Sequence, residues 1–205
     1  TTTTYFKRRV TSGSVSDEQF FIIVEVTPAI NNNTISPDQT ICQSLVPAEI
    51  SGSDEPLLSG GLGSGTSSFS WQSRQDNGNW SVIEGETSTG YAPGALNDTT
   101  YFRRIVSSGV CTDYSDSLSI IVLPSISGNN PVSPQDVYCN NQEISPINAL
   151  NLSGGDGSYS YQWVTKTGSG DWTADVTTQE YPAVTLPSDG SSIQTYDFRR
   201  IVYSG

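Results

Sequence analysis

The sequence contains no histidine and no methionine among its 205 residues, and only three of them are cysteine. Without histidine, neither a Ser-His-Asp triad nor a Cys-His pair can be built. Zinc sites made of cysteine and histidine are excluded by number and residue type as well. We therefore expect a protein that is not an enzyme, because the main remaining route to catalysis is a pair of carboxylates.

Acidic residues come close together in the sequence at two places that could supply such a pair. These are Glu84 with Glu86, and Asp113 with Asp116. Neither pair belongs to a recognisable catalytic motif, and we interpret all four as solvated loop carboxylates. The predicted sets of catalytic and cofactor-binding residues are therefore empty.

Basic residues and long apolar runs are also scarce. Nine Lys and Arg stand against 21 Asp and Glu, which gives a formal net charge of −12. Phosphate backbones and anionic lipids attract cationic proteins, so we expect no nucleic-acid partner and no electrostatic membrane partner. No run of 18 apolar residues is present, and we expect no direct membrane insertion.

Calcium is the one metal for which suitable oxygen ligands exist, because it binds carboxylate, amide and carbonyl groups. The segments Asp76-Asn77-Gly78 and Gly154-Gly155-Asp156-Gly157 could each donate some of them. Neither segment has the ligand spacing of a calcium loop, and Asp-Asn-Gly is a common hairpin turn. We predict no cofactor and no metal, with calcium as the remaining alternative.

What the sequence does contain is a repeat. Segments 3–10, 99–106 and 195–202 read TTYFKRRV, TTYFRRIV and TYDFRRIV, so their phenylalanines are spaced by 96 residues. The SPDQTIC segment at 36–42 returns as SPQDVYC at 133–139. A period near 96 residues is the size of one immunoglobulin domain.

The repeat predicts the domain organisation and the fold class. Short apolar strands separated by Gly, Ser and Pro favour an all-β fold of tandem immunoglobulin-like antiparallel β-sandwich domains. Pro28 and Pro124 each follow an apolar strand and mark the starts of repeats. We expect 1–27 to end a preceding repeat, 28–123 to be complete, and 124–205 to lack its last strand or strands, as in a piece of a longer chain.

Aromatic and arginine residues recur at matching places in the repeats and are predicted to form the structural core. The predicted core residues are Trp71, Trp80, Phe102, Arg104, Trp163, Trp172, Phe198 and Arg200. Arg104 lies between Phe102 and Val106 on one strand face, where an unpaired guanidinium would be very costly. We expect its head group to stack on a ring such as Trp80 or to reach an acid.

The three cysteines predict one disulfide. Cys42 and Cys111 both lie within 28–123 and flank Trp71, an order similar to that of immunoglobulin domains. We expect a Cys42–Cys111 bond between the first strand and the last hairpin, with two free thiols as the alternative. Cys139 is expected to be unpaired, because its partner falls at about position 207, and Val15 replaces cysteine in the first repeat.

The segments 99–111, 36–42 and 154–163, together with Tyr91-Ala-Pro-Gly-Ala-Leu96, resemble repeats of SprB-like giant cell-surface gliding adhesins. The resemblance covers essentially the whole chain in the register of the 96-residue period. It implies type IX secretion, display at the outer membrane, cell adhesion and gliding motility. The implied partners are neighbouring repeats, surface polysaccharide or substratum, and the outer-membrane motility and secretion machinery.

Three functions compete at this point. The first is a stalk segment that spaces an adhesive tip from the cell. The second is a carbohydrate- or protein-binding module of another type IX-secreted surface protein. The third is an accessory domain of an enzyme. Strand-like alternation around the tryptophans favours core packing, and hence the stalk.

Overall fold

The computed structural model describes residues 2–133, 135–149 and 151–204. Within these ranges the chain is all-β, and no helix is formed. No described helix is therefore available that could cross a membrane. The chain divides into unit 1 (Thr1–Val122) and unit 2 (Leu123–Gly205), so residues 1–27 fall within unit 1 by their contacts. The prediction of an all-β fold is confirmed.

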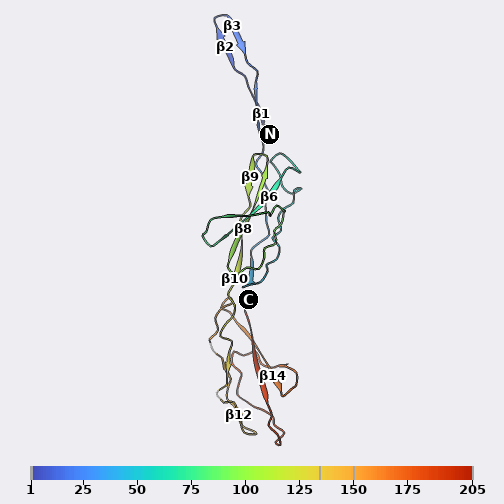
Figure 1. Cartoon of the computed structure of the whole chain (residues 1–205), viewed down its shortest axis with the longest axis vertical. Coiled ribbons are helices and arrows are strands. Elements are labelled where there is room, and N and C mark those ends of the chain that lie inside the picture. Colours follow the sequence, from blue (N-terminus) through green and yellow to red (C-terminus); the bar gives the residue numbers. More distant parts are fainter. Residues whose placement is uncertain (1, 134, 150, 205) are drawn as a thin grey trace. The chain divides into compact units, whose positions relative to one another are not determined.

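The main sheet of unit 1 is antiparallel (Figure 1). Its strands are β5 (Gln39–Cys42), β6 (Ser68–Gln75), β7 (Ser81–Ile83), β8 (Thr100–Ser108), β9 (Cys111–Tyr114) and β10 (Leu118–Leu123). They are ordered β5-β10-β8-β6-β7, and β9 pairs with the second half of β8. The longest strand, β8, therefore has β6 along one edge and β10 followed by β9 along the other.

The side chains of β8 alternate strictly between the interior and the outer face. Thr100, Phe102, Arg104, Val106 and Ser108 are buried, while the residues between them are only partly buried. Successive side chains of a strand point to opposite faces, so the apolar period of two in the sequence fixes which face packs inward. The sheet thus places Arg104 on the same face as Phe102.

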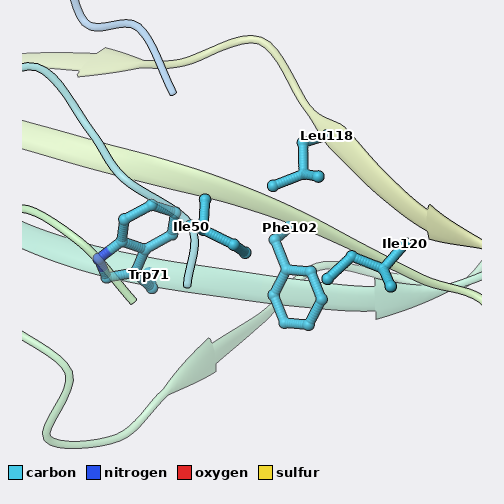
Figure 2. Close-up of a cluster of buried hydrophobic side chains, with 5 residues drawn as sticks. All are labelled: Ile50, Trp71, Phe102, Leu118 and Ile120. Atoms are coloured by element: carbon cyan, nitrogen blue, oxygen red, sulfur yellow. The ribbon is translucent and has the colours of Figure 1, made fainter. Parts of the chain in front are cut away.

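The core of unit 1 lies between this face and a less regular layer of chain. Ile50, Trp71, Phe102, Leu118 and Ile120 form its buried cluster, and Figure 2 shows Ile50 close to Trp71. The less regular layer is joined by isolated bridges, Asn31–Ser59, Ile35–Gly52 and Ile50–Tyr91, rather than by long strands. Backbone pairing in this layer is therefore sparse, and side-chain contacts must hold it to the sheet.

The β6–β7 hairpin turns at the predicted segment Asp76-Asn77-Gly78. The strands pair with Trp71 opposite Ile83, and the Gly78 amide donates to the Gln75 carbonyl at 2.8 Å. The left-handed conformation falls on Asp76, with a φ of 41°, and not on the Asn-Gly pair. Asp tolerates this conformation because its short polar side chain can bond locally.

Unit 2 repeats the central part of this sheet. Its strands are β11 (Pro131–Val132), β12 (Glu143–Ile144), β13 (Asn148–Ala149), β14 (Ser160–Thr167), β15 (Thr173–Ala174), β16 (Val184–Thr185) and β17 (Tyr196–Tyr203). Trp163 on β14 lies opposite Arg200 on β17, just as Trp71 on β6 lies opposite Arg104 on β8. Strand β17 is thus the counterpart of β8, and Trp163 occupies the place of Trp71 in a second buried cluster.

Residues 2–26 form two pairs of strands. They comprise β1 (Thr2–Phe6), β2 (Arg9–Ser12), β3 (Val15–Glu18) and β4 (Ile22–Val26). β1 pairs with β4, placing Phe6 opposite Ile22, and β2 pairs with β3. The same register appears 96 residues later, where Phe102 lies opposite Leu118. These strands are therefore counterparts of β8, β9 and β10, and their apolar residues are exposed.

Two neighbouring residues of β10 test this packing with a built-in control. Ile120 is fully buried, whereas Ile121 is 44% exposed. We expect Ile120→Ala to lower the free energy of unfolding of unit 1 by about 2–5 kcal/mol, because it leaves a cavity in the core. Ile121→Ala should cost less than about 1 kcal/mol. Urea titration of both variants measures the difference, and equal losses would contradict the placement of β10.

Candidate functional site: an arginine clamp at the start of each repeat

A buried arginine joins the first segment of the repeat 28–123 to the central strand of its sheet. The Arg104 side chain is fully buried and makes five hydrogen bonds. Nε donates to Oδ1 of Asn33 at 2.9 Å, and the two Nη groups donate to the carbonyls of Ser53 (3.0 Å), Thr89 (2.9 Å) and Thr34 (3.5 Å) and to Oγ of Ser53 (2.9 Å). We call this set of contacts the arginine clamp.

The electrostatics of the clamp depend on carbonyl dipoles. Burial lowers the pKa of the Arg104 guanidinium, and the nearby Asp54 carboxylate acts in the opposite direction. The guanidinium lies over the Phe69 ring at 5.2 Å. The expected stacking on an aromatic ring is therefore confirmed, although the ring is that of Phe69 and not that of Trp80. Backbone carbonyls accept most of the hydrogen bonds of the buried guanidinium. Several acceptors are needed because an arginine has five N–H donors in a fixed geometry and no acceptor.

Asn33 completes the clamp from the other side. It is 7% exposed, and while its Oδ1 accepts from Arg104, its Nδ2 donates to the Asp113 carbonyl at 3.3 Å. Arg104 is also held through its backbone, since Ser115 Oγ accepts from its amide at 2.9 Å. A Cβ on Gly52 would collide with the guanidinium and with the Thr89 carbonyl, so the clamp needs a glycine there.

Unit 2 contains a reduced form of the clamp, in which Nη2 of Arg200 is buried and has no hydrogen-bond partner among the described residues. Arg200 is 3% exposed, its Nε donates to Oδ1 of Asn129 at 2.8 Å, and its Nη1 donates to the Gln179 carbonyl at 3.1 Å. Asn129 Nδ2 donates in turn to the Arg200 carbonyl at 3.1 Å. The ring beneath the guanidinium is that of Tyr161, at 5.5 Å. Asn33 and Asn129 are spaced by 96 residues, like the two arginines.

Glycines bring the chain close together beside each clamp. The Gly61 amide donates to the Pro28 carbonyl at 3.0 Å, and the Gly155 amide donates to the Pro124 carbonyl at 2.7 Å. Both glycines are left-handed, with φ of 58° and 61°. A Cβ on Gly61 would lie 2.5 Å from Ser108 Oγ, so glycine is required there on two counts. Pro28 and Pro124, which start the two repeats, are thereby bonded to a glycine of the same repeat.

Two predicted core residues lie outside the core. Trp80 is only partly buried and Trp172 is 37% exposed. Trp80 is flanked by Arg74 at 5.1 Å and Arg103 at 4.3 Å, on the outer face of the sheet. The prediction that both tryptophans belong to the core is wrong, because each follows a turn, where strand alternation no longer fixes the inward face.

On this outer face, aromatic rings and guanidinium groups alternate in a row. Arg74 lies 4.5 Å from the Tyr101 ring, and Arg103 lies 4.5 Å from the Tyr114 ring. In unit 2, Trp172 is flanked by Lys166 at 5.1 Å and Arg199 at 4.5 Å. Such contacts contribute about 0.5–1 kcal/mol each at exposed sites.

The remaining predicted core residues are placed as follows. Trp71, Phe102 and Trp163 are buried, and so are the two clamp arginines. Phe198 is only partly buried, although it packs against the cluster of Trp163.

The predicted Cys42–Cys111 disulfide is not formed, and all three cysteines are free. Cys42 ends β5, close to the start of β8, because Ser44 N donates to the Leu96 carbonyl at 2.8 Å. Cys111 lies opposite Ser108 at the far end of β8, with its Sγ 2.9 Å from Thr27 Oγ1. Nine residues of strand span roughly 30 Å, whereas a disulfide needs Cα atoms within about 7 Å. The expected partner of Cys139 near position 207 follows from the Cys42–Cys111 pairing. Because that pairing is not formed, the free thiol of Cys139 gives no support for such a partner.

The candidate acidic and calcium-binding residues are not gathered into a site. No group of three or more Cys, Asp or Glu side chains that could hold a metal occurs among the described residues. Asp113 contributes its carbonyl to Asn33, and Asp156 bonds to Ser204 Oγ at 2.6 Å. This Ser204 hydroxyl and the Ser158 amide lower the pKa of the Asp156 carboxyl.

Comparison with known families adds one finding. Residues 31–124 match a family model described as a domain of unknown function (DUF8696). The matched segment spans Asn33, Arg104 and Trp71, and hence the whole clamp of unit 1. Comparison with curated proteins finds no match for the chain.

Replacing the clamp arginine tests how much the clamp stabilises unit 1. Lysine keeps the charge but cannot reach Asn33, Ser53 and Thr89 together, so Arg104→Lys leaves buried carbonyls unsatisfied. We expect a loss of about 3–5 kcal/mol in the free energy of unfolding, measured by urea titration. Arg103→Lys, on the outer face of the same strand, is the control and should cost less than about 1 kcal/mol. Similar losses of stability for Arg104→Lys and Arg103→Lys would contradict a special role for the buried arginine.

Proposed function

We propose that the chain is a repetitive stalk segment of a large secreted bacterial cell-surface adhesin that serves gliding motility and surface attachment. The observation that carries this proposal is the recurrence of the clamp, Arg104 with Asn33 and Arg200 with Asn129, at the period of the sequence repeat. A stalk is a series of similar domains, and each must hold its own entry segment firmly.

The position of the clamp suits a domain under tension. The repeat 28–123 begins at Pro28, whose carbonyl bonds to Gly61, and Asn33 lies five residues further on. Force applied to the entry segment acts on the Asn31–Ser59 bridge and on the guanidinium bonds together. Several bonds loaded at once resist extension better than the same bonds broken one after another.

An immunoglobulin-like sandwich topology forms part of the proposal. It is supported by the 96-residue period, by an antiparallel sheet around a buried tryptophan, and by a second layer that covers Trp71. The second layer consists of isolated bridges, so the assignment rests on layer packing and repeat length.

The resemblance of the repeats supplies the cellular setting of the proposal. Export by type IX secretion places the chain outside the cell at the outer membrane, with neighbouring repeats as its immediate partners. Contact with polysaccharide or substratum, and with the motility machinery, belongs to the parent adhesin. No catalytic activity is proposed.

Single-molecule force spectroscopy tests the stalk. The chain is tethered at its two ends and extended at constant speed. We expect Arg104→Lys to lower the force at which unit 1 unfolds, and Arg103→Lys to leave it unchanged, because only the buried arginine ties the entry segment to β8. Unfolding of the parent chain at forces no higher than those of the Arg104→Lys variant would contradict a mechanical role.

A second function, binding of surface carbohydrate, is favoured by a different observation. Trp172 is 37% exposed and lies between Lys166 and Arg199 on the outer face of unit 2. An exposed indole flanked by cations offers a flat apolar surface with hydrogen-bond donors beside it, which suits an acidic sugar.

A glycan array read with the intact chain tests this second function. If the outer face binds acidic polysaccharide, Trp172→Ala abolishes the signal, while Trp172→Phe keeps part of it because a ring remains. Tyr203→Ala, which removes another exposed aromatic side chain from unit 2, is the control. A signal that survives Trp172→Ala would exclude this face as the binding site.

A further inference from the structure

In the part of the chain from 28 to 205, every basic residue outside the two clamps lies beside Trp80 or Trp172. The clamps take Arg104 and Arg200. The other four are Arg74, Arg103, Lys166 and Arg199. The whole chain has 21 acidic residues and only nine basic ones, so an abundance of positive charge does not explain why these cations gather on the outer faces.

On unit 1 the cations alternate with three aromatic rings. The Arg74 guanidinium lies 5.1 Å from the centre of the Trp80 ring and 4.5 Å from that of Tyr101. The Arg103 guanidinium lies 4.3 Å from Trp80 and 4.5 Å from Tyr114. We call these five residues the arginine ladder. Tyr114 is 52% exposed, so the ladder reaches the solvent.

The sheet that carries the arginine ladder is almost free of acidic residues. Asp113 is the one Asp or Glu within its six strands, and it lies opposite Val106, a residue of the inward face. The charged residues at outward positions of the sheet are therefore all basic, in a chain whose formal net charge is −12. A cationic face that is kept clear of acids favours an anionic ligand.

The two arginines of the ladder keep hydrogen-bond donors free. Neither forms a salt bridge in the described part of the chain. Arg103 donates from Nε to Oε1 of Gln72 at 2.8 Å, and Arg74 donates from Nη1 to the Asp76 carbonyl. Within the described residues both Nη groups of Arg103 remain without an acceptor. A guanidinium with free, coplanar donors is suited to bind a carboxylate bidentately.

Unit 2 has a weaker version of this face. Strand pairing places Asp197 opposite Lys166 in unit 2, where Tyr101 lies opposite Arg74 in unit 1. The Asp197 carboxylate lies 3.1 Å from the Lys166 ammonium and offsets its charge. Of the two faces, that of unit 1 is therefore the better site for an anion.

We propose that the arginine ladder of unit 1 binds an acidic polysaccharide whose negative charges are uronic-acid carboxylates. This inference rests on the second proposed function, binding of surface carbohydrate, and deepens it by naming the ligand class and a site that does not include Trp172. Arg74 and Arg103 hold carboxylates of the ligand. The ring edges and Val82, which is 51% exposed and lies opposite Gln72, contact the apolar faces of the sugar rings.

Charge density selects this ligand over other polyanions. Duplex DNA carries about one charge per 1.7 Å of its axis, and heavily sulfated glycans are also densely charged. The acidic remainder of the chain repels such ligands strongly. A polyuronate has no more than one carboxylate per sugar and separates its charges by apolar ring faces, which matches the alternation of guanidinium groups and rings. The planar carboxylate also fits the flat fork of arginine.

Fluorescence anisotropy of labelled oligogalacturonate with the intact chain tests the proposal, and alginate and hyaluronate oligomers extend the panel. We expect Arg74→Gln and Arg103→Gln each to weaken binding about tenfold, because each removes one charge-assisted contact. Arg103→Lys should weaken it less, since the charge remains without the fork. Val82→Glu adds a carboxylate at an exposed site beside the ladder and should weaken binding with all five ladder residues intact.

Two controls separate the ladder from general electrostatics. Arg9→Gln removes the same charge from β2, where the side chain is 64% exposed, and should leave the affinity unchanged. Methyl esterification of oligogalacturonate masks its carboxylates on an unchanged backbone and should abolish binding. Urea titration of each variant shows that its folding is retained.

Several outcomes would overturn the proposal. They are binding to none of the three polyuronates, equal binding of the methyl ester, and equal weakening by Arg9→Gln. Binding of dextran sulfate or single-stranded DNA alone would replace the ligand class. A loss of binding in Trp172→Ala, with the unit 1 variants unaffected, would remove the site from the ladder while leaving carbohydrate binding in place. Failure of the ladder and failure of the second proposed function are thus told apart.

Discussion

The structure depends on the requirement that a buried guanidinium must have acceptors for its donors. Arg104 and Arg200 lie in the middle of the inward faces of β8 and β17, where they are almost completely buried and form no hydrogen bond to a carboxylate in the described chain. A buried charge without acceptors is very costly. Every side-chain nitrogen of Arg104 is bonded, whereas Nε and Nη1 of Arg200 are bonded and its Nη2 has no partner among the described residues. The surrounding segments are therefore held wherever they can present an oxygen atom to the arginine, and this fixes the path of a layer that has few backbone bonds of its own.

This requirement explains why a sparse second layer is sufficient. Asn33, Thr34, Ser53 and Thr89 come from three separate stretches of sequence, and each presents an oxygen acceptor to the same side chain. In a regular sandwich these stretches would be joined by ladders of backbone bonds. Here one side chain takes over much of that task, and the apolar cluster around Trp71 supplies the rest.

The sequence allowed the repeat, the all-β class and the inward face of β8 to be predicted, because all three follow from periodicity. It also singled out Arg104 as anomalous, since a charge stood in an apolar alternation. Its partners could not be predicted, because carbonyl groups leave no mark in the sequence. The recurrence of asparagine at 33 and 129, at the spacing of the two arginines, is the one signal in the sequence that points to a partner of the guanidinium. The disulfide prediction failed because sequence order does not reveal that Cys42 and Cys111 lie at opposite ends of the same strand.

The clamp also determines how freely these repeats can change their sequence. A backbone carbonyl can be supplied by any residue type, and the acceptor provided by Thr89 in unit 1 is provided by Gln179 in unit 2. Substitution at such positions leaves the bond intact, whereas the arginine, its asparagine and the glycine that bonds the proline carbonyl recur in both units. A tandem array of this kind can therefore diversify its surface from one repeat to the next while the arginine, the asparagine and this glycine preserve the architecture.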